Sequence, residues 1–422
     1  MRRVRGVKSL VHNAVDRTVD LVEAGHDSTA RAVMRVLERS GPLAAPARRA
    51  DGVRRAFTAA ILGTVKGVNH LVEQATDVGL DVFAPTGTGR EAPLPLRSDV
   101  MNTPAWFADA AVGAANGVVG DHLAYTQNGL GLGMALRGLD TWIELDGGGV
   151  PVNAGPRIVV LVHGLATTEW SWCLDAAVLH GDPASNFGTL LQADLGYTPV
   201  FARYNTGRHV SESGRSLSAR LEALVTNWPV AVEEIVLLGH SMGGLVARSA
   251  CHIAGLEGKS WVTRVQRVVM LGSPLQGAAL EKFGNLAGAA FSAVDLPATV
   301  IIGQLINGRS AGIKDLRYGY VQDAEWAGRD ADAFAQDQRL DVELPAHISW
   351  CFISGTVASS PNHPVSQALG DLLVRVESAS GPRDAPPIVT THHVGGVHHG
   401  AVQVHPAVYA LVRQFLGASC PR

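Results

Sequence analysis

The five residues Gly239-His240-Ser241-Met242-Gly243 place a hydroxyl nucleophile between two glycines. The preceding Glu-Ile-Val-Leu-Leu is typical of a buried strand, and the following Leu-Val-Ala-Arg-Ser-Ala is typical of a helix. A strand, a Gly-x-Ser-x-Gly turn and a helix in this order form a nucleophile elbow, in which a strained turn exposes the serine Oγ at the top of a sheet. The dipole of the following helix favours negative charge at that point. The pattern therefore predicts nucleophilic catalysis by Ser241.

A serine nucleophile of this kind needs a carboxylate and a histidine, which follow it in that order along the chain. Asp371 comes after the apolar run 348–353, so we expect it in a loop beyond a strand. Asp295, Asp315 and Asp323 are weaker candidates, because they lie in an irregular segment and do not follow a strand. The base is one of four imidazoles that precede the last amphipathic helix at 407–416, and the residues alone leave the choice open: His392, His393, His398 and His399.

Strand-like and helix-like segments alternate through the part of the chain that carries these residues. The predicted strands are 157–162, 198–203, 234–238, 266–271, 348–354 and 388–392, with an earlier one expected at 142–145. A helix is predicted over 211–228, and another over 105–123. Such alternation is the signature of an α/β fold with a mainly parallel sheet. It stops between Gly277 and Pro345, an interval far longer than an ordinary connection of about 2–6 residues.

Further motifs lie at the ends of the predicted strands: His163-Gly164-Leu165, Arg203-Tyr204-Asn205-Thr206-Gly207 and Leu271-Gly272-Ser273-Pro274-Leu275-Gln276-Gly277. Near the end of the chain, His399 precedes the pair His405-Pro406 by six residues. Together with the elbow, these motifs resemble those of α/β-hydrolases of the bacterial lipase and esterase type. The resemblance covers about residues 150–417. It is specific for the superfamily and much less so for a substrate.

The resemblance implies an α/β-hydrolase fold with a helical lid or cap at about 277–345. It also implies a catalytic triad of Ser241, Asp371 and His399, with His398 as the alternative base. The oxyanion hole would consist of the backbone N–H groups of Leu165 and Met242. Trp170 and Trp172 would line the acyl pocket, with core packing as the alternative interpretation for both. No metal and no organic cofactor is expected for this chemistry.

The expected function is that of a serine carboxylic-ester hydrolase acting on lipid or other hydrophobic esters. The alternatives are a lipid acyltransferase, a GPI inositol-deacylase-like enzyme and a polyester depolymerase, all of which use the same acyl-enzyme. A non-catalytic lipid-surface-binding protein on a hydrolase scaffold is the alternative from another class. The net charge of −3 gives no reason to expect a nucleic-acid partner.

The first part of the chain differs in charge and pattern from the rest. Residues 1–58 contain twelve Lys or Arg against six Asp or Glu, and apolar residues recur at helical spacing with a weak repeat. We expect an amphipathic helical extension over 1–83, a linker over 84–104 and the hydrolase domain over 105–422. The extension is either a helical hairpin packed in the protein or a contact to a membrane or lipid-particle surface. Without an apolar leader, the expected location is cytoplasmic, with peripheral lipid contact as the alternative.

Overall fold

The computed structural model describes residues 6, 8–9, 93–101, 103–144, 153–278, 310–328, 339–340, 342, 345–356, 358–359, 371, 374–381 and 389–418. Apart from Gly6, Lys8 and Ser9, which are helical, the predicted extension over 1–83 lies outside these residues, as does much of the predicted lid or cap at 277–345. The chain divides into two compact units, Met1–Gly89 with Thr126–Leu130, and Arg90–Tyr125 with Gly131–Arg422. In the first unit, the Asn128 side chain donates a hydrogen bond to the carbonyl of Gly6, at 3.1 Å.

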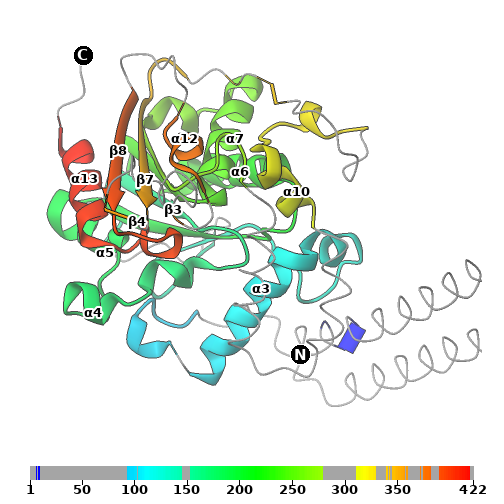
Figure 1. Cartoon of the computed structure of the whole chain (residues 1–422), viewed down its shortest axis with the longest axis horizontal. Helices are drawn as coiled ribbons and strands as arrows, with labels where there is room; N and C mark the ends of the chain where they lie inside the picture. The colour runs from blue at the N-terminus through cyan, green and yellow to red at the C-terminus, as the bar shows by residue number, and fades with distance from the viewer. Residues whose placement is uncertain are drawn as a thin grey trace, which may run out of the picture. The chain divides into compact units, whose positions relative to one another are not determined.

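The second unit contains one eight-stranded sheet among its described residues (Figure 1). Its order is β2-β1-β4-β3-β5-β6-β7-β8. The strands are β1 (Ala135–Arg137), β2 (Trp142–Ile143), β3 (Arg157–Val162), β4 (Thr198–Arg203), β5 (Glu234–His240), β6 (Val265–Leu271), β7 (Ser349–Thr356) and β8 (Val389–Gly395). From β4 to β8 all neighbours are parallel, whereas β1 is antiparallel to both β2 and β4. The sheet confirms the predicted α/β-hydrolase fold class.

Helices and short 3-10 turns connect these strands. The α-helices are α3 (Pro104–Tyr125), α4 (Ala176–His180), α5 (Phe187–Leu195), α6 (Val210–Asn227), α7 (Met242–Glu257), α10 (Ala311–Tyr318), α12 (Val376–Ala379) and α13 (Pro406–Gly417). The 3-10 turns are η2 (Ser98–Val100), η3 (Glu169–Cys173), η4 (Trp261–Arg264), η5 (Asp323–Glu325) and η6 (His399–Ala401). None of the helices in the described part of the chain is long and apolar enough to cross a bilayer.

The strand predictions were accurate in the centre of the sheet and weaker at its edge. β3 and β4 have the predicted bounds, and β5 continues two residues further, to His240. The short strand β1 was missed, and the edge strand β2 is shorter than the segment expected at 142–145. The reason is physical, since β1 is only three residues long and one of them is a charged arginine, Arg137, that is fully buried.

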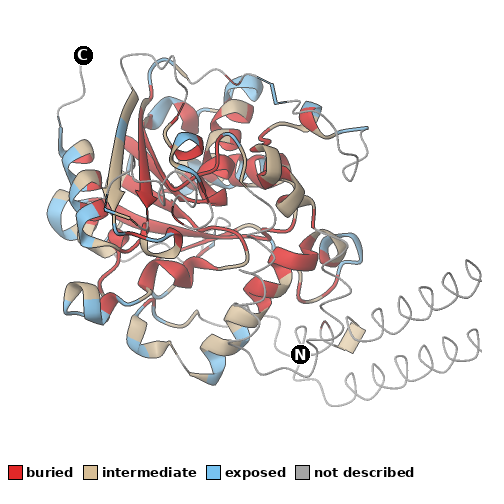
Figure 2. Ribbon diagram, viewed as in Figure 1, coloured by how far each residue is buried: buried red, intermediate tan, exposed pale blue. Residues whose placement is uncertain are grey.

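The sheet has an apolar layer on each face, and β3 shows how one strand supplies both. Ile158, Val160 and Val162 pack in one cluster, which includes side chains of α6 and α7. Val159 and Leu161 pack in the other, with side chains of α5 and α13. This alternation follows from the two-residue period of a strand. The strands are buried throughout the centre of Figure 2, as expected for a parallel sheet that is covered on both faces.

The described part of the segment 277–345, the predicted lid or cap, is attached to the rest of the second unit through α10. The Asp315 carboxylate is buried and accepts hydrogen bonds from the His209 ring, at 3.0 Å, and from the Val210 backbone N–H, at 2.8 Å. The Trp326 ring stacks on the His209 ring, with 3.6 Å between centroids. Asp315 is therefore used to hold the insertion at the start of α6.

Replacing a residue of the central strand tests how much the two-layer core contributes. Leu237 in β5 has no exposed surface, so Leu237→Ala should lower the free energy of unfolding by about 2–5 kcal/mol. Leu256→Ala is the matched control, because that side chain is 76% exposed and its loss should change stability by less than about 0.5 kcal/mol. Urea unfolding followed by circular dichroism measures both. Equal effects of the two substitutions would contradict the assignment of this core.

Candidate active site

The turn between β5 and α7 has a strained backbone at Ser241. This residue has φ 53° and ψ −123°, in the left-handed half of backbone space that residues with a side chain rarely adopt. Its N–H donates to the carbonyl of Leu271 at the end of β6, at 2.8 Å, and its carbonyl accepts from Gly244 at 3.1 Å. These bonds hold the strained residue between two strand ends and the first turn of a helix. Such strain persists only where the surroundings enforce it.

Both glycines of the Gly-x-Ser-x-Gly motif are required by close backbone contacts. A Cβ atom on Gly239 would lie 2.5 Å from the Cα of Gly244, and one on Gly243 would lie 2.1 Å from the carbonyl oxygen of Val162. Both distances are far below van der Waals contact, and the atoms concerned are backbone atoms that cannot move aside. The start of α7 thus packs directly on the ends of β3 and β5.

Ser241 lies in a crowded turn, and only 3% of the whole residue is accessible. The His163-Gly164 turn after β3 lies against it, since a Cβ on Gly164 would be 3.1 Å from the Cβ of Ser241. The sequence pattern placed the serine at the top of the sheet but could not show that this turn covers it.

The segment after β3 is held by hydrogen bonds on several sides. The Tyr204 hydroxyl donates to the carbonyl of His163 at 2.8 Å, and the two rings stack. Thr167 Oγ1 donates to the carbonyl of Gly164 at 2.9 Å. The Ala166 N–H donates to Thr206 Oγ1 at 3.1 Å, and Ala166 itself has a positive φ of 58°. These bonds fix the loop that contains Leu165, which is a predicted oxyanion donor.

Asp371 and His399 are brought together although 28 residues separate them. His399 Nδ1 donates to Asp371 Oδ2 at 2.8 Å, and Asp371 Oδ1 accepts from the Val374 N–H at 2.8 Å. A second link joins the His399 N–H to the carbonyl of Asp371, at 2.9 Å. Both residues are buried, whereas the alternative base His398 is exposed. The alternative carboxylate Asp323 pairs with Arg215, and Asp315 pairs with His209.

His240 connects Ser241 to this Asp–His pair. Its Nε2–H donates to the carbonyl of His399 at 3.0 Å, and the centroids of the two rings are 4.9 Å apart. Gly272, at the end of β6, lies on the other side of the pair, because a Cβ there would be 3.3 Å from Asp371 Oδ2 and 3.4 Å from His399 Nδ1. Burial lowers the pKa of His240 to about 3, so this imidazole is neutral at physiological pH.

The remaining predicted site residues take different positions. Met242, the first residue of α7, is fully buried, and Leu165 is 6% exposed. Trp170 lies in the wall of an apolar pocket between α3 and η3, and its indole N–H donates to Asp109 at 3.3 Å. Trp172 is fully buried in the core near Phe187, with 6.2 Å between ring centroids. Of the two tryptophans, Trp170 lines this pocket and Trp172 is not among its lining residues.

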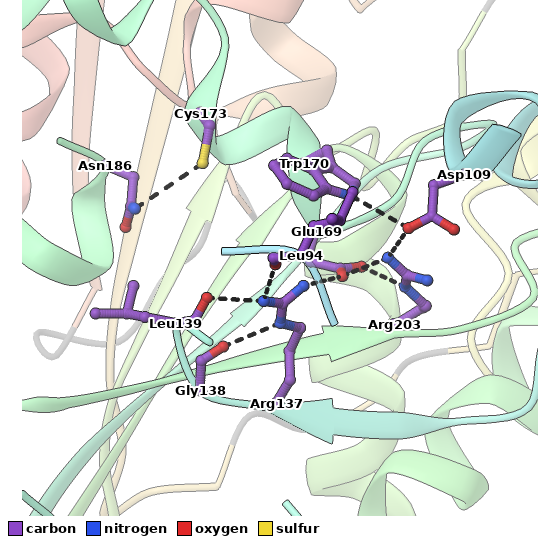
Figure 3. Close-up of polar contacts among 10 residues, drawn as sticks. All are labelled: Leu94, Asp109, Arg137, Gly138, Leu139, Glu169, Trp170, Cys173, Asn186 and Arg203. Atoms are coloured by element: carbon purple, nitrogen blue, oxygen red, sulfur yellow. Dashed lines mark hydrogen bonds and ion pairs between the residues drawn. The ribbon is translucent and has the colours of Figure 1, made fainter. Parts of the chain in front are cut away.

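A buried network of four charges joins η3 to β1, β4 and α3 (Figure 3), and no sequence pattern indicated it. Glu169 accepts hydrogen bonds from Arg137 at 3.1 Å and from Arg203 at 2.6 and 2.7 Å. Arg203 also donates to Asp109 of α3 at 2.8 Å. Arg137 uses its other N–H groups on the carbonyls of Leu94, Gly138 and Leu139. Two positive and two negative side chains thus balance each other, as buried charges must.

The network keeps Glu169 ionised in spite of its complete burial. Burial alone would raise the pKa of this carboxyl, but the charges and hydrogen bonds of Arg203 and Arg137 outweigh it and hold the pKa below its ordinary value. A carboxyl with a lowered pKa in the folded state adds stability above its unfolded pKa, and that contribution is lost as the pH falls through the folded pKa. The 3-10 turn η3 is therefore attached to β1, β4 and α3 mainly at neutral pH.

Glu169→Gln should be strongly destabilising at pH 7, because it leaves two buried arginines without their shared counter-charge. Breaking a buried pair costs about 3–5 kcal/mol of unfolding free energy. The difference from wild type should shrink as the pH falls from about 4.3, the ordinary pKa that this carboxyl has in the unfolded chain, through its lower pKa in the folded state, where Glu169 loses its charge. Asp99→Asn is the control, because its ion pair with Arg97 is exposed and its loss should leave the unfolding transition unchanged. A pH-independent difference for Glu169→Gln would contradict this account.

One domain family and several solved structures are similar to this chain. Residues 157–293 match the PGAP1-like alpha/beta domain family. No curated protein matches the sequence. Among solved structures, the mature lipase BlEst2 of Bacillus licheniformis aligns at 17% identity and a TM-score of 0.40, over 64% of this chain and 96% of that one. The esterase Pf2001 of Pyrococcus furiosus aligns at 17% identity and a TM-score of 0.37, over 64% and 84%. The phospholipase PlaB of Legionella pneumophila aligns at 16% identity and a TM-score of 0.40, over 62% and 59%.

The matched segment begins with β3 and includes the His163-Gly164-Leu165 turn, Ser241 and the Gly272-Ser273-Pro274 turn, but not Asp371 or His399. The sheet order, the strained serine between β5 and α7 and this match together identify the chain as an α/β-hydrolase-fold protein that contains a segment similar to the PGAP1-like alpha/beta domain.

Proposed function

We propose that this chain is a serine carboxylic-ester hydrolase acting on lipid or other hydrophobic esters. The observation that carries the proposal is the strained Ser241 beside a buried Asp371–His399 pair, with His240 hydrogen-bonded to His399 between them. The order of the three residues along the chain, Ser, Asp, His, is the order used by hydrolases with this elbow. The match to the PGAP1-like domain family covers the Ser241 part of the arrangement.

In the proposed mechanism, His399 is the general base. Its Nδ1–H is engaged by Asp371, which leaves Nε2 free of a proton and able to take the one on Ser241 Oγ as that oxygen attacks an ester carbonyl. Asp371 then stabilises the imidazolium that forms. The tetrahedral intermediate would place its negative oxygen at the backbone N–H groups of Met242 and Leu165. His399 then protonates the leaving alcohol. Water attacks the acyl-enzyme while His399 takes its proton, and His399 returns that proton to Ser241 Oγ as the carboxylic acid leaves.

The main alternatives share the first half of this reaction. A lipid acyltransferase, a GPI inositol-deacylase-like enzyme or a polyester depolymerase would form the same Ser241 ester and differ in the substrate or in the acceptor of the acyl group. No observation among the described residues favours one of them over hydrolysis of a hydrophobic ester. The apolar pocket beside the loop of Leu165 supports the choice of a hydrophobic substrate.

Hydrolysis of p-nitrophenyl esters by paired variants tests the proposal. Ser241→Ala and His399→Ala should each lower kcat by about 10³-fold or more, because removing either member disables the whole triad. His398→Ala is the matched control, since this neighbouring imidazole is exposed, and it should keep nearly full activity. Full activity of His399→Ala, or loss with His398→Ala alone, would overturn the assignment of the base.

His240 should act as a positioning residue for His399. His240→Leu removes the donor to the His399 carbonyl and should lower kcat about 10–100-fold with little change in KM, in line with the cost of a lost buried hydrogen bond. His240→Gln keeps an N–H donor and should restore most of the rate. If both variants lose the same activity, or if only KM rises, the hydrogen bond to His399 has no such role.

A further inference from the structure

The structure contains an apolar pocket of about 190 Å³ between α3 and the segment that follows the oxyanion loop. One wall includes Trp106, Phe107 and Ala110 of α3. The opposite wall includes Ala166, Trp170 and Leu174. Ser241 is not among the lining residues, but Ala166, which lines the pocket, is two residues after the Gly164 that packs on Ser241.

The polar atoms along this pocket are mostly occupied by partners in the protein. Thr167 Oγ1 donates to the carbonyl of Gly164, Ser171 Oγ donates to Gln403 at 3.1 Å, and the Trp170 indole donates to Asp109. The surface that faces the pocket is therefore mainly hydrocarbon. A ligand there gains free energy from burying apolar surface, as a hydrocarbon chain does.

The two walls of the pocket are joined by the buried charges. Asp109 belongs to α3 and accepts hydrogen bonds both from Trp170 in the opposite wall and from Arg203 (Figure 3). Glu169, the neighbour of Trp170, is held by Arg203 and Arg137. A pocket whose walls are connected in this way keeps its shape before a ligand arrives, which lowers the entropic cost of binding.

Small residues let α3 lie directly on the loop that continues from the predicted oxyanion site. A Cβ on Gly113 would lie 2.8 Å from the Thr168 side chain, and one on Gly117 would lie 2.5 Å from the Ala166 Cβ. Both glycines are buried. The helix α3 precedes the 157–293 segment that matches the PGAP1-like domain family. The wall of the pocket that α3 forms is therefore contributed by a part of the chain outside that segment.

We propose that this pocket binds the acyl chain of the ester and that α3 determines the chain length accepted. The inference rests on the proposed function, because an acyl chain reaches the pocket only as part of an ester held at Ser241. The loop from Gly164 to Ala166 packs on Ser241 at its first residue and lines the pocket at its last. Each methylene of the chain that enters the pocket should raise kcat/KM about four-fold until the pocket is filled. Beyond that length, kcat/KM should level off.

Enlarging Ala110 tests the proposal through the chain-length profile. With p-nitrophenyl esters from C2 to C12, Ala110→Leu should shorten the chain length at which kcat/KM stops rising by about three carbons. The reason is that leucine has three more carbons than alanine and the site is closely packed. Ala108→Leu is the matched control, since Ala108 is an exposed residue of the same helix and not part of the lining. An unchanged profile in an active Ala110→Leu enzyme would overturn the role of α3.

Direct binding separates this proposal from the catalytic one. Brominated dodecanoate should quench tryptophan fluorescence in the Ser241→Ala protein, because Trp106 and Trp170 line the pocket. Ala110→Leu should weaken that binding at least ten-fold, and Ala108→Leu should not. Binding without ester turnover by the wild type would contradict the proposed function and leave the pocket supported. Turnover without binding, or equal binding by both leucine variants, would overturn the pocket.

Discussion

At the carboxyl end of β5, the chain turns into α7 with no room for a Cβ atom on either flanking glycine. Gly239 lies against Gly244, and Gly243 lies against the carbonyl of Val162 at the end of β3. Because these contacts are between backbone atoms, Ser241 is forced into a positive φ and its own N–H reaches the carbonyl of Leu271 in β6. The ends of three parallel strands therefore meet at one residue, and the proposed chemistry depends on that convergence.

The elements around this turn are held together by paired buried charges as well as by apolar packing. The Arg137–Glu169–Arg203–Asp109 network joins β1, β4, η3 and α3 in a region with almost no solvent access. Desolvation makes every member costly on its own, and mutual pairing compensates that cost. The loop that contains Leu165 and the pocket beside it are therefore positioned by residues that are distant in the chain. Asp109 and Arg203 are 94 positions apart, and Arg137 and Glu169 are 32 positions apart.

The sequence was a good guide wherever a local pattern determines the structure. The apolar run before the elbow predicted β5, and the position of Asp371 beyond a strand, together with the family-like ending at His399, predicted the pair that the structure joins at 2.8 Å. It failed where contacts are long-range. Nothing in the three-residue β1 indicates that Arg137 is buried against Glu169, and nothing near Ser241 in the sequence shows that the Gly164 turn covers it. Such features depend on the fold as a whole.

The most direct test of the central claim is to map the site of covalent modification by a fluorophosphonate, using tandem mass spectrometry of the folded wild-type protein. A serine activated by His399 should react at neutral pH, and the phosphonyl mass should lie on Ser241 alone. A folded protein that gives no adduct, or an adduct on another serine with Ser241 unmodified, would contradict the account.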